Sequence, residues 1–148
     1  MSNPANLTIV LAEDDDGHAS LIERNLKRAG LKASLLRTRN GLELMQLFGN
    51  SGIQQTQRTV VLLDLRMPHM DGMQTLRRLK SDEGTATIPV FVLSTTDDER
   101  EIEECFRLGC NAYLTKPVEY DKFADLLQRL ALFLEIAAVP GPSSGPER

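Results

Sequence analysis

The fold of this chain is decided by the stretch Val60–Val61–Leu62–Leu63–Asp64–Leu65–Arg66–Met67–Pro68. Its first four residues are apolar and two of them are β-branched, which is typical of a strand covered on both faces. The aspartate that follows lies where such a strand leaves its sheet, and a proline-containing turn comes next. Ligands of open α/β sheets bind at that edge. We therefore expect Asp64 to lie in a functional site.

Short apolar runs alternate with segments of helical periodicity along the chain. The expected strands are Leu7–Ala12, Ala33–Thr38, Val60–Leu63, Val90–Leu93 and Ala112–Thr115. The expected helices are His18–Ala29, Gly41–Phe48, Met73–Lys80, Glu99–Leu108 and a long last one from Tyr120 to about Ala137. This alternation predicts an α/β fold, a doubly wound parallel sheet of five strands with five helices.

The length and composition predict one domain. The 148 residues are 41% apolar and 26% charged, which is ordinary for a globular protein. We expect the domain to span residues 1–138 and the Pro/Gly/Ser-rich tail, 139–148, to be disordered. The spacing of Thr96 and Glu99 predicts a capping box at the start of the fourth helix.

Charge and targeting signals limit the environment of the protein. The net charge of −4 argues against binding to nucleic acid. The N-terminal residues lack the basic and apolar regions of a signal peptide, and no apolar run is long enough to span a membrane. Cys105 and Cys110 have neither metal-site nor redox-motif spacing, which fits buried thiols in a reducing compartment. We expect a cytoplasmic protein without membrane contact.

Charged side chains follow two more strands at the same edge. Glu13, Asp14, Asp15 and Asp16 follow the first strand, and Lys116–Pro117 follows the last. Close carboxylates repel by about 4 kcal/mol per pair at an effective dielectric constant of 20. A hard cation would relieve this repulsion, and Mg²⁺ prefers such oxygen ligands. The alternative, that Asp15 or Asp16 is the N-cap of the first helix, accounts for one acid only.

These residue types suit phosphoryl transfer. A carboxylate beside Mg²⁺ can attack phosphorus and form an acyl phosphate. The transferred group then needs positive charge and hydrogen-bond donors, which Lys116 and Ser94 offer. Two simpler readings stay open: Lys116 could form a salt bridge with the acids, and Ser94 could be an ordinary turn residue.

The combination of Glu13–Asp14, Asp64, Ser94 and Lys116–Pro117 resembles the receiver domain of two-component response regulators. The segment Met67–Pro68–His69–Met70–Asp71–Gly72 is similar to a turn of that family, and the resemblance covers about residues 7 to 136. It implies a flavodoxin-like sheet with strand order 2-1-3-4-5. It also implies a signalling switch that accepts and later loses a phosphoryl group, not an enzyme with a separate substrate.

The resemblance implies a role for each site residue. Asp64 accepts the phosphoryl group from a sensor histidine kinase. Asp14 and Asp64 bind Mg²⁺ directly, Glu13 acts through water, and the backbone carbonyl of Arg66 completes the protein ligands. Three further roles concern residues near the phosphoryl group: Ser94 and Lys116 contact it, Tyr113 is the switch aromatic, and the Lys116–Pro117 bond is cis. His18 and His69 are expected to be surface or loop histidines.

The end of the chain suggests how the signal is passed on. No effector domain follows, so we expect a stand-alone receiver. Leu132, Ile136 and Val139 fall outside the apolar stripe that would cover the sheet. Either the tail folds back over them, or a homodimer forms through the fourth helix, fifth strand, last helix and C-terminal arm. The arm also resembles a subgroup of stand-alone receivers that serve phytochrome-type, light-sensing histidine kinases.

The residues argue against two other functions and leave a third open. A dehalogenase-type phosphatase would need an acid where Arg66 stands, and a nucleotide-binding module would not place Glu13 to Asp16 beside phosphate. The remaining competitor is a receiver-like interaction module that does not cycle phosphate.

Overall fold

The computed structural model describes residues 7–49 and 58–137. Its strands are β1 (Leu7–Ala12), β2 (Ala33–Thr38), β3 (Arg58–Leu63), β4 (Val90–Ser94) and β5 (Ala112–Thr115). Its helices are α1 (Asp16–Arg28), α2 (Gly41–Gly49), α3 (Gly72–Ser81), α4 (Glu99–Leu108) and α5 (Tyr120–Ile136). Every expected element is present, with most boundaries within two residues of the prediction.

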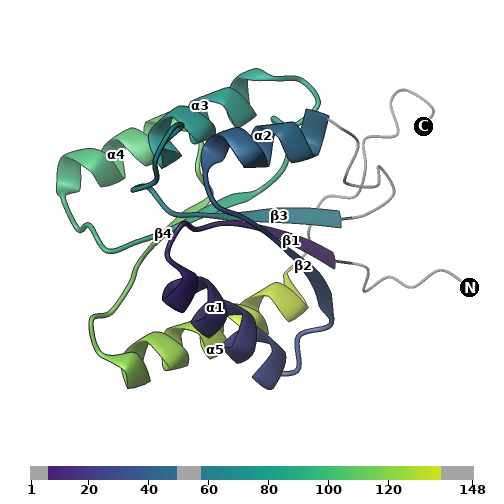
Figure 1. Ribbon diagram of the computed structural model, residues 1–148, viewed down its shortest axis with the longest axis vertical. Helices are drawn as coiled ribbons and strands as arrows, with labels where there is room; N and C mark the ends of the chain where they lie inside the picture. Colours follow the sequence, from purple (N-terminus) through teal and green to yellow (C-terminus); the bar gives the residue numbers. More distant parts are fainter. Residues whose placement is uncertain (1–6, 50–57, 138–148) are drawn as a thin grey trace, which may run out of the picture.

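The five strands form one parallel sheet in the order β2-β1-β3-β4-β5, as predicted. Helices α1 and α5 cover one face, and α2, α3 and α4 cover the other (Figure 1). The order reverses next to β1, which runs between β2 and β3. In a sheet of this kind the ligand site lies at the carboxyl ends of the strands beside this reversal.

The sheet separates two apolar cores. Alternate residues of β1 point to opposite faces, because side chains alternate along a strand. Ile9 and Leu11 pack with α1 and α5, whereas Val10 and Ala12 pack with the helices of the other face. Both faces of β1 are therefore buried, which explains why this strand is apolar throughout.

The start of α4 differs from the prediction. The N-cap is Asp98, whose side chain accepts a hydrogen bond from the Arg100 backbone. Thr96 does not cap the helix; its hydroxyl accepts from the backbone of Asp98 at 3.2 Å. A capping box does occur, at α3, between Asp71 and Gln74. Several polar residues of this loop could cap a helix, so spacing alone did not identify the right one.

The predicted cis bond before Pro117 is wrong. No cis peptide bond occurs within residues 7–49 and 58–137. Trans is the favoured form of an X–Pro bond by about 0.5–1 kcal/mol. Proline makes a cis bond accessible but does not select it.

Helix α5 leaves apolar side chains exposed at its C-terminal end. Its buried stripe is formed by Phe123, Leu127, Leu130, Ala131 and Leu134. Leu132 and Ile136 lie outside this stripe and are 57% and 84% exposed. Phe133 is half exposed as well, although its ring lies 6.0 Å from that of Phe91. Val139 and the predicted disordered tail lie outside the described residues.

In residues 7–49 and 58–137, no helix is both long and apolar enough to cross a bilayer.

The turn that carries Asp64 depends on a glycine. The backbone N–H of Gly72 donates to the carbonyl of Leu65 at 2.9 Å, which folds the turn back on itself. A Cβ atom on Gly72 would lie 2.4 Å from the carbonyl oxygen of Asp64 and 2.5 Å from the Cα of Leu65. Both neighbours are backbone atoms, so any larger residue would displace the turn.

We expect Gly72→Ala to lower the free energy of unfolding by about 1 to 3 kcal/mol, the usual cost of overpacking. Gly84→Ala is the matched control, because a Cβ there meets nothing within 4 Å. Urea denaturation of both variants measures the difference. Equal stabilities would show that the turn accommodates a side chain.

Candidate functional site

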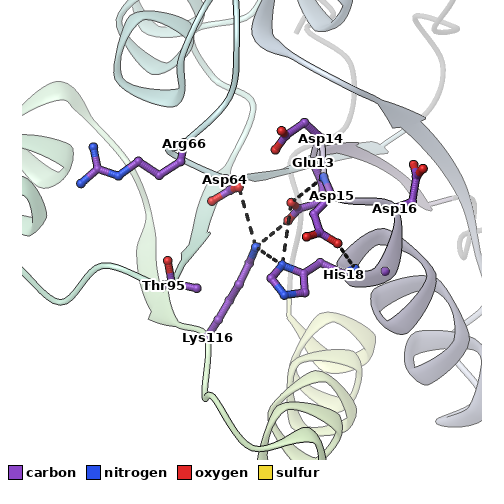
Figure 2. Close-up of a pocket in the computed structure, with 10 residues that line it drawn as sticks. Glu13, Asp14, Asp15, Asp16, His18, Asp64, Arg66, Thr95 and Lys116 are labelled. Carbon is purple, nitrogen blue, oxygen red and sulfur yellow. Dashed lines mark hydrogen bonds and ion pairs between the residues drawn. The ribbon is translucent and has the colours of Figure 1, made fainter.

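The candidate site is an open cavity of about 610 Å³ at the carboxyl ends of the strands. Glu13 and Asp14 follow β1, Asp64 follows β3, and Lys116 follows β5. Figure 2 shows these side chains converging from separate strands. The sheet order explains the convergence, since β1 and β3 are direct neighbours in register.

Three carboxylates form a cluster that fits a divalent cation. One oxygen each from Glu13, Asp14 and Asp64 lies within 4.8 Å of the others. Glu13 and Asp64 are buried, and Asp14 is exposed toward the cavity. Carboxylate oxygens in this number suit a hard cation such as Mg²⁺, which keeps several water ligands. The donor set on the protein therefore matches the predicted metal site.

Lys116 is the positive partner within this cluster. Its Nζ lies 2.6 Å from Glu13 Oε1 and 3.7 Å from Asp64 Oδ2, and both Lys116 and Glu13 are nearly inaccessible to water. The salt bridge considered from the sequence is thus present, mainly with Glu13. The longer distance to Asp64 leaves that carboxylate less fully paired.

The site raises the pKa of Asp64 to about 6, from an ordinary value of 3.8. Burial is the main cause, and the nearby charge of Glu13 adds to it. The ammonium of Lys116 and the backbone amides of Arg66 and Leu65 act in the opposite direction. Asp64 is therefore mostly ionised at neutral pH, but its ionised form is destabilised by burial. A bound cation would stabilise this negative charge.

Ser94 and Tyr113 are not among the residues that line the cavity, but both contact Thr96, the neighbour of lining residue Thr95. Ser94 is fully buried at the end of β4, and its hydroxyl accepts from the backbone of Thr96 at 3.4 Å. The Tyr113 hydroxyl donates to the Thr96 carbonyl at 2.7 Å, and burial raises the pKa of Tyr113 to about 12. The loop after β4 thus connects the two residues. Among the residues of that loop, exposed Thr95 lines the cavity.

The Arg66 side chain points away from the acids in Figure 2. Its guanidinium donates to Glu101 of α4 at 2.7 Å. The backbone amide of Arg66 is directed to the site, where it lowers the pKa of Asp64. The predicted ligand role of its carbonyl stays a prediction.

His18 was missed by the sequence interpretation, which treated it as a surface or loop residue. It lines the cavity, and its Nδ1 lies 3.1 Å from Lys116 Nζ. A lysine ammonium only donates hydrogen bonds, so this nitrogen accepts. Its position could have been inferred from the N-cap of α1. The cap is Asp15, one of the two residues considered for that role, and His18 is the third residue of the helix.

His69 lies outside this cavity and has a positive φ of 66° in the turn after β3.

Comparison with known proteins gives matches to response regulators and their receiver domains. A family model described as response regulator receiver domain matches residues 9–128. Response regulator Rcp1 of Synechocystis is 30% identical over 142 residues, which are 94% of this chain and 96% of Rcp1. Its solved Mn²⁺-bound form is similar with a TM-score of 0.81 at 28% identity, over 90% of this chain and 99% of that one.

Two other solved structures are similar over nearly the whole chain. A response regulator receiver domain from Rhodospirillum rubrum has a TM-score of 0.86 and 39% identity, over 93% of this chain and 99% of that one. The phosphorylated cyanobacterial phytochrome response regulator RcpA has a TM-score of 0.83 and 29% identity, over 92% and 99%. The chain therefore spans almost the full length of these proteins.

The raised pKa of Asp64 gives a prediction about stability and pH. Between about pH 4 and 6 the native state holds a proton that the unfolded state has released, so ionising Asp64 destabilises the fold as pH rises. We expect Asp64→Asn to raise the free energy of unfolding at pH 7.5 by on the order of 1 to 2 kcal/mol. At pH 4 the difference should nearly vanish, since Asp64 is then neutral.

Chemical denaturation in EDTA at both pH values measures this effect. Asp14→Asn serves as the control, because its exposed carboxylate should change stability less. A variant Asp64→Asn that is less stable than the parent at pH 7.5 would contradict the prediction.

Proposed function

Because this chain belongs to the response regulator receiver family, we propose that it is a signalling switch that accepts a phosphoryl group on Asp64 from a sensor histidine kinase. One observation carries the proposal: Asp64 shares a cavity with two further carboxylates and a buried lysine. This set supplies an acceptor, a cation site and a positive charge for the transferred group.

The cation in this proposal is Mg²⁺. Glu13, Asp14, Asp64 and the backbone carbonyl of Arg66 would hold it, and the solved Mn²⁺-bound form of Rcp1 supports a divalent ion. When bound, the cation would neutralise charge that gathers on the phosphoryl oxygens. The raised pKa of Asp64 indicates that a bound cation would stabilise its ionised carboxylate.

The transfer itself moves one phosphoryl group between two side chains. A carboxylate oxygen of Asp64 attacks phosphorus, and the bond from phosphorus to the kinase imidazole nitrogen breaks with its electron pair returning to that nitrogen. Lys116 then has a new anionic neighbour. Because its present distance to Asp64 is 3.7 Å, a small shift of Nζ would pair it with the phosphoryl group.

The signal would leave the site through Ser94 and Tyr113. The Ser94 hydroxyl, which now accepts from the Thr96 backbone at 3.4 Å, would donate its own hydrogen to a phosphoryl oxygen on Asp64, and its movement toward that oxygen would loosen the contact to Thr96. Movement of this loop would disturb the bond between Tyr113 and the Thr96 carbonyl. We propose that the face formed by α4, β5 and α5 then shifts toward a second conformation. Hydrolysis of the acyl phosphate by water resets the switch.

We further propose a cytoplasmic protein that acts in light signalling. The support is the similarity to RcpA, which is described as a phytochrome response regulator. The partner would then be a phytochrome-type histidine kinase.

The proposed output includes a homodimer. Leu132 and Ile136 lie four residues apart on α5, so they share a helix face, and both are exposed. Phe106 on α4 and Tyr120 at the start of α5 are exposed as well. Exposed apolar side chains on these two helices fit a two-fold contact. A phosphate-independent interaction module is the alternative. It would not explain why three carboxylates and a buried lysine meet in one cavity.

Acetyl phosphate tests the phosphoryl acceptor directly. With Mg²⁺ present, we expect intact-mass spectrometry to show the gain of one phosphoryl group, and EDTA should abolish the gain. Asp64→Asn should not be labelled, whereas Asp97→Asn, at an exposed position on the loop after β4, should be labelled like the parent. Labelling of Asp64→Asn would show that the acceptor is a different residue.

Light scattering after size-exclusion chromatography tests the dimer. We expect the parent protein to have the mass of two chains and Ile136→Glu to have the mass of one, because a buried unpaired carboxylate is costly. Lys122→Glu, an exposed change near the start of α5, should leave the dimer intact. A parent protein that is monomeric both with and without acetyl phosphate would rule out this output.

A further inference from the structure

Arg37 makes a set of contacts with the loop between β1 and α1 that no catalytic role explains. It lies on β2, beside Leu11 of β1 in the sheet register. Its Nε and Nη2 donate to the backbone carbonyl of Glu13 at 2.9 and 2.7 Å. Its Nη1 donates to Asp16 Oδ1 at 2.9 Å. One guanidinium therefore joins both ends of the acidic run.

The backbone of Glu13 is fixed from the same strand on its other side. Its N–H donates to the carbonyl of Thr38 at 3.0 Å. The Thr38 hydroxyl in turn donates to the Leu11 carbonyl at 3.0 Å. Both polar backbone groups of Glu13 are thus bound by β2, and this orients the peptide that leads to Asp14.

The rigid fork of arginine suits this task. A guanidinium presents several N–H groups in one plane, so two of them can bind one carbonyl while a third reaches a carboxylate. Arg39 provides a contrast. Its side chain donates to Asp16 Oδ1 at 2.9 Å, and its backbone N–H donates to Glu43 rather than to Glu13. Both arginines place a positive charge near the acids, but only Arg37 holds their backbone.

We propose that Arg37 is a positioning residue for the cation site: by fixing the Glu13 backbone, it holds the carboxylates of Glu13 and Asp14 in the arrangement that binds the divalent ion. The inference rests on the proposed function of these acids. Residues outside the ligand set that orient the ligands commonly contribute tenfold or more to metal affinity.

Electrostatics alone predicts the opposite effect. A guanidinium near a cation site repels the cation, so removing its charge should tighten binding. Loss of positioning should weaken binding. The sign of the change therefore separates the two effects, and Arg39 reports the electrostatic effect by itself.

Direct titration with Mn²⁺, followed by the electron paramagnetic resonance signal of the free ion, tests the proposal without a phosphoryl donor. We expect Arg37→Gln to weaken Mn²⁺ binding by roughly tenfold. Arg37→Lys, which keeps the charge but loses the fork, should also weaken it. Arg39→Gln should bind Mn²⁺ as tightly as the parent or more tightly.

A second readout separates positioning from a general loss of structure. In labelling by acetyl phosphate, the Mg²⁺ concentration for half-maximal rate should rise in both Arg37 variants, while the rate at saturating Mg²⁺ stays near that of the parent. Urea denaturation in EDTA identifies any variant that is partly unfolded under these conditions. If Arg37→Gln does not fold, Arg37→Lys carries the test.

The outcomes are distinct. Unchanged or tighter Mn²⁺ binding in folded Arg37 variants would overturn the positioning role and leave the metal site intact. A parent protein that does not bind Mn²⁺ would overturn the proposed metal site itself, and this inference with it.

Discussion

The ion pair between Glu13 and Lys116 joins the first strand to the last at the centre of the charged pocket. Its atoms are 2.6 Å apart, and its side chains are only 1% and 2% exposed. Burying one such charge without a partner costs several kcal/mol, so each residue requires the other. The pair does not neutralise the pocket, since Asp14 and Asp64 remain beside it. Burial is the main cause of the raised pKa of Asp64, and the charge of Glu13 adds to it. The excess of negative charge in the pocket favours a cation.

The two sides of the pocket differ in how firmly they are held. On one side, the loop after β1 is fixed by Arg37 and Thr38, and Asp15 caps α1 through a 2.9 Å bond from the backbone of His18. On the other side, Thr96 of the loop after β4 is held by a long 3.4 Å contact to Ser94 and by a 2.7 Å bond from the Tyr113 hydroxyl. A firmly held loop suits the binding of a cation, and a loop held by side-chain hydroxyls that can reorient suits a change of conformation. The sequence places both loops at the ends of strands, but the difference between them arises from side-chain contacts.

Most of the site was predictable because parallel strands bring their carboxyl ends to one edge. Asp64, Lys116 and the acids after β1 could be placed there from apolar runs alone. Arg37 could not, because its contacts depend on the register of β2, and His18 could be placed only by choosing Asp15 as the N-cap of α1. The predictions of a cis bond before Pro117 and of Thr96 as the capping residue of α4 were wrong for a related reason. Each is selected by local contacts among several acceptable choices.

The separation of Glu13 and Lys116 along the chain affects how the protein is made. The two residues are 103 positions apart, and chains are synthesised from the N-terminus. When β1, β2 and β3 have left the ribosome, the carboxyl of Glu13 still lacks its buried partner. The charged pocket can close only after β5 has been released, when nearly all of the domain has been translated. Until then, the acids of the nascent chain remain exposed to water and to free cations.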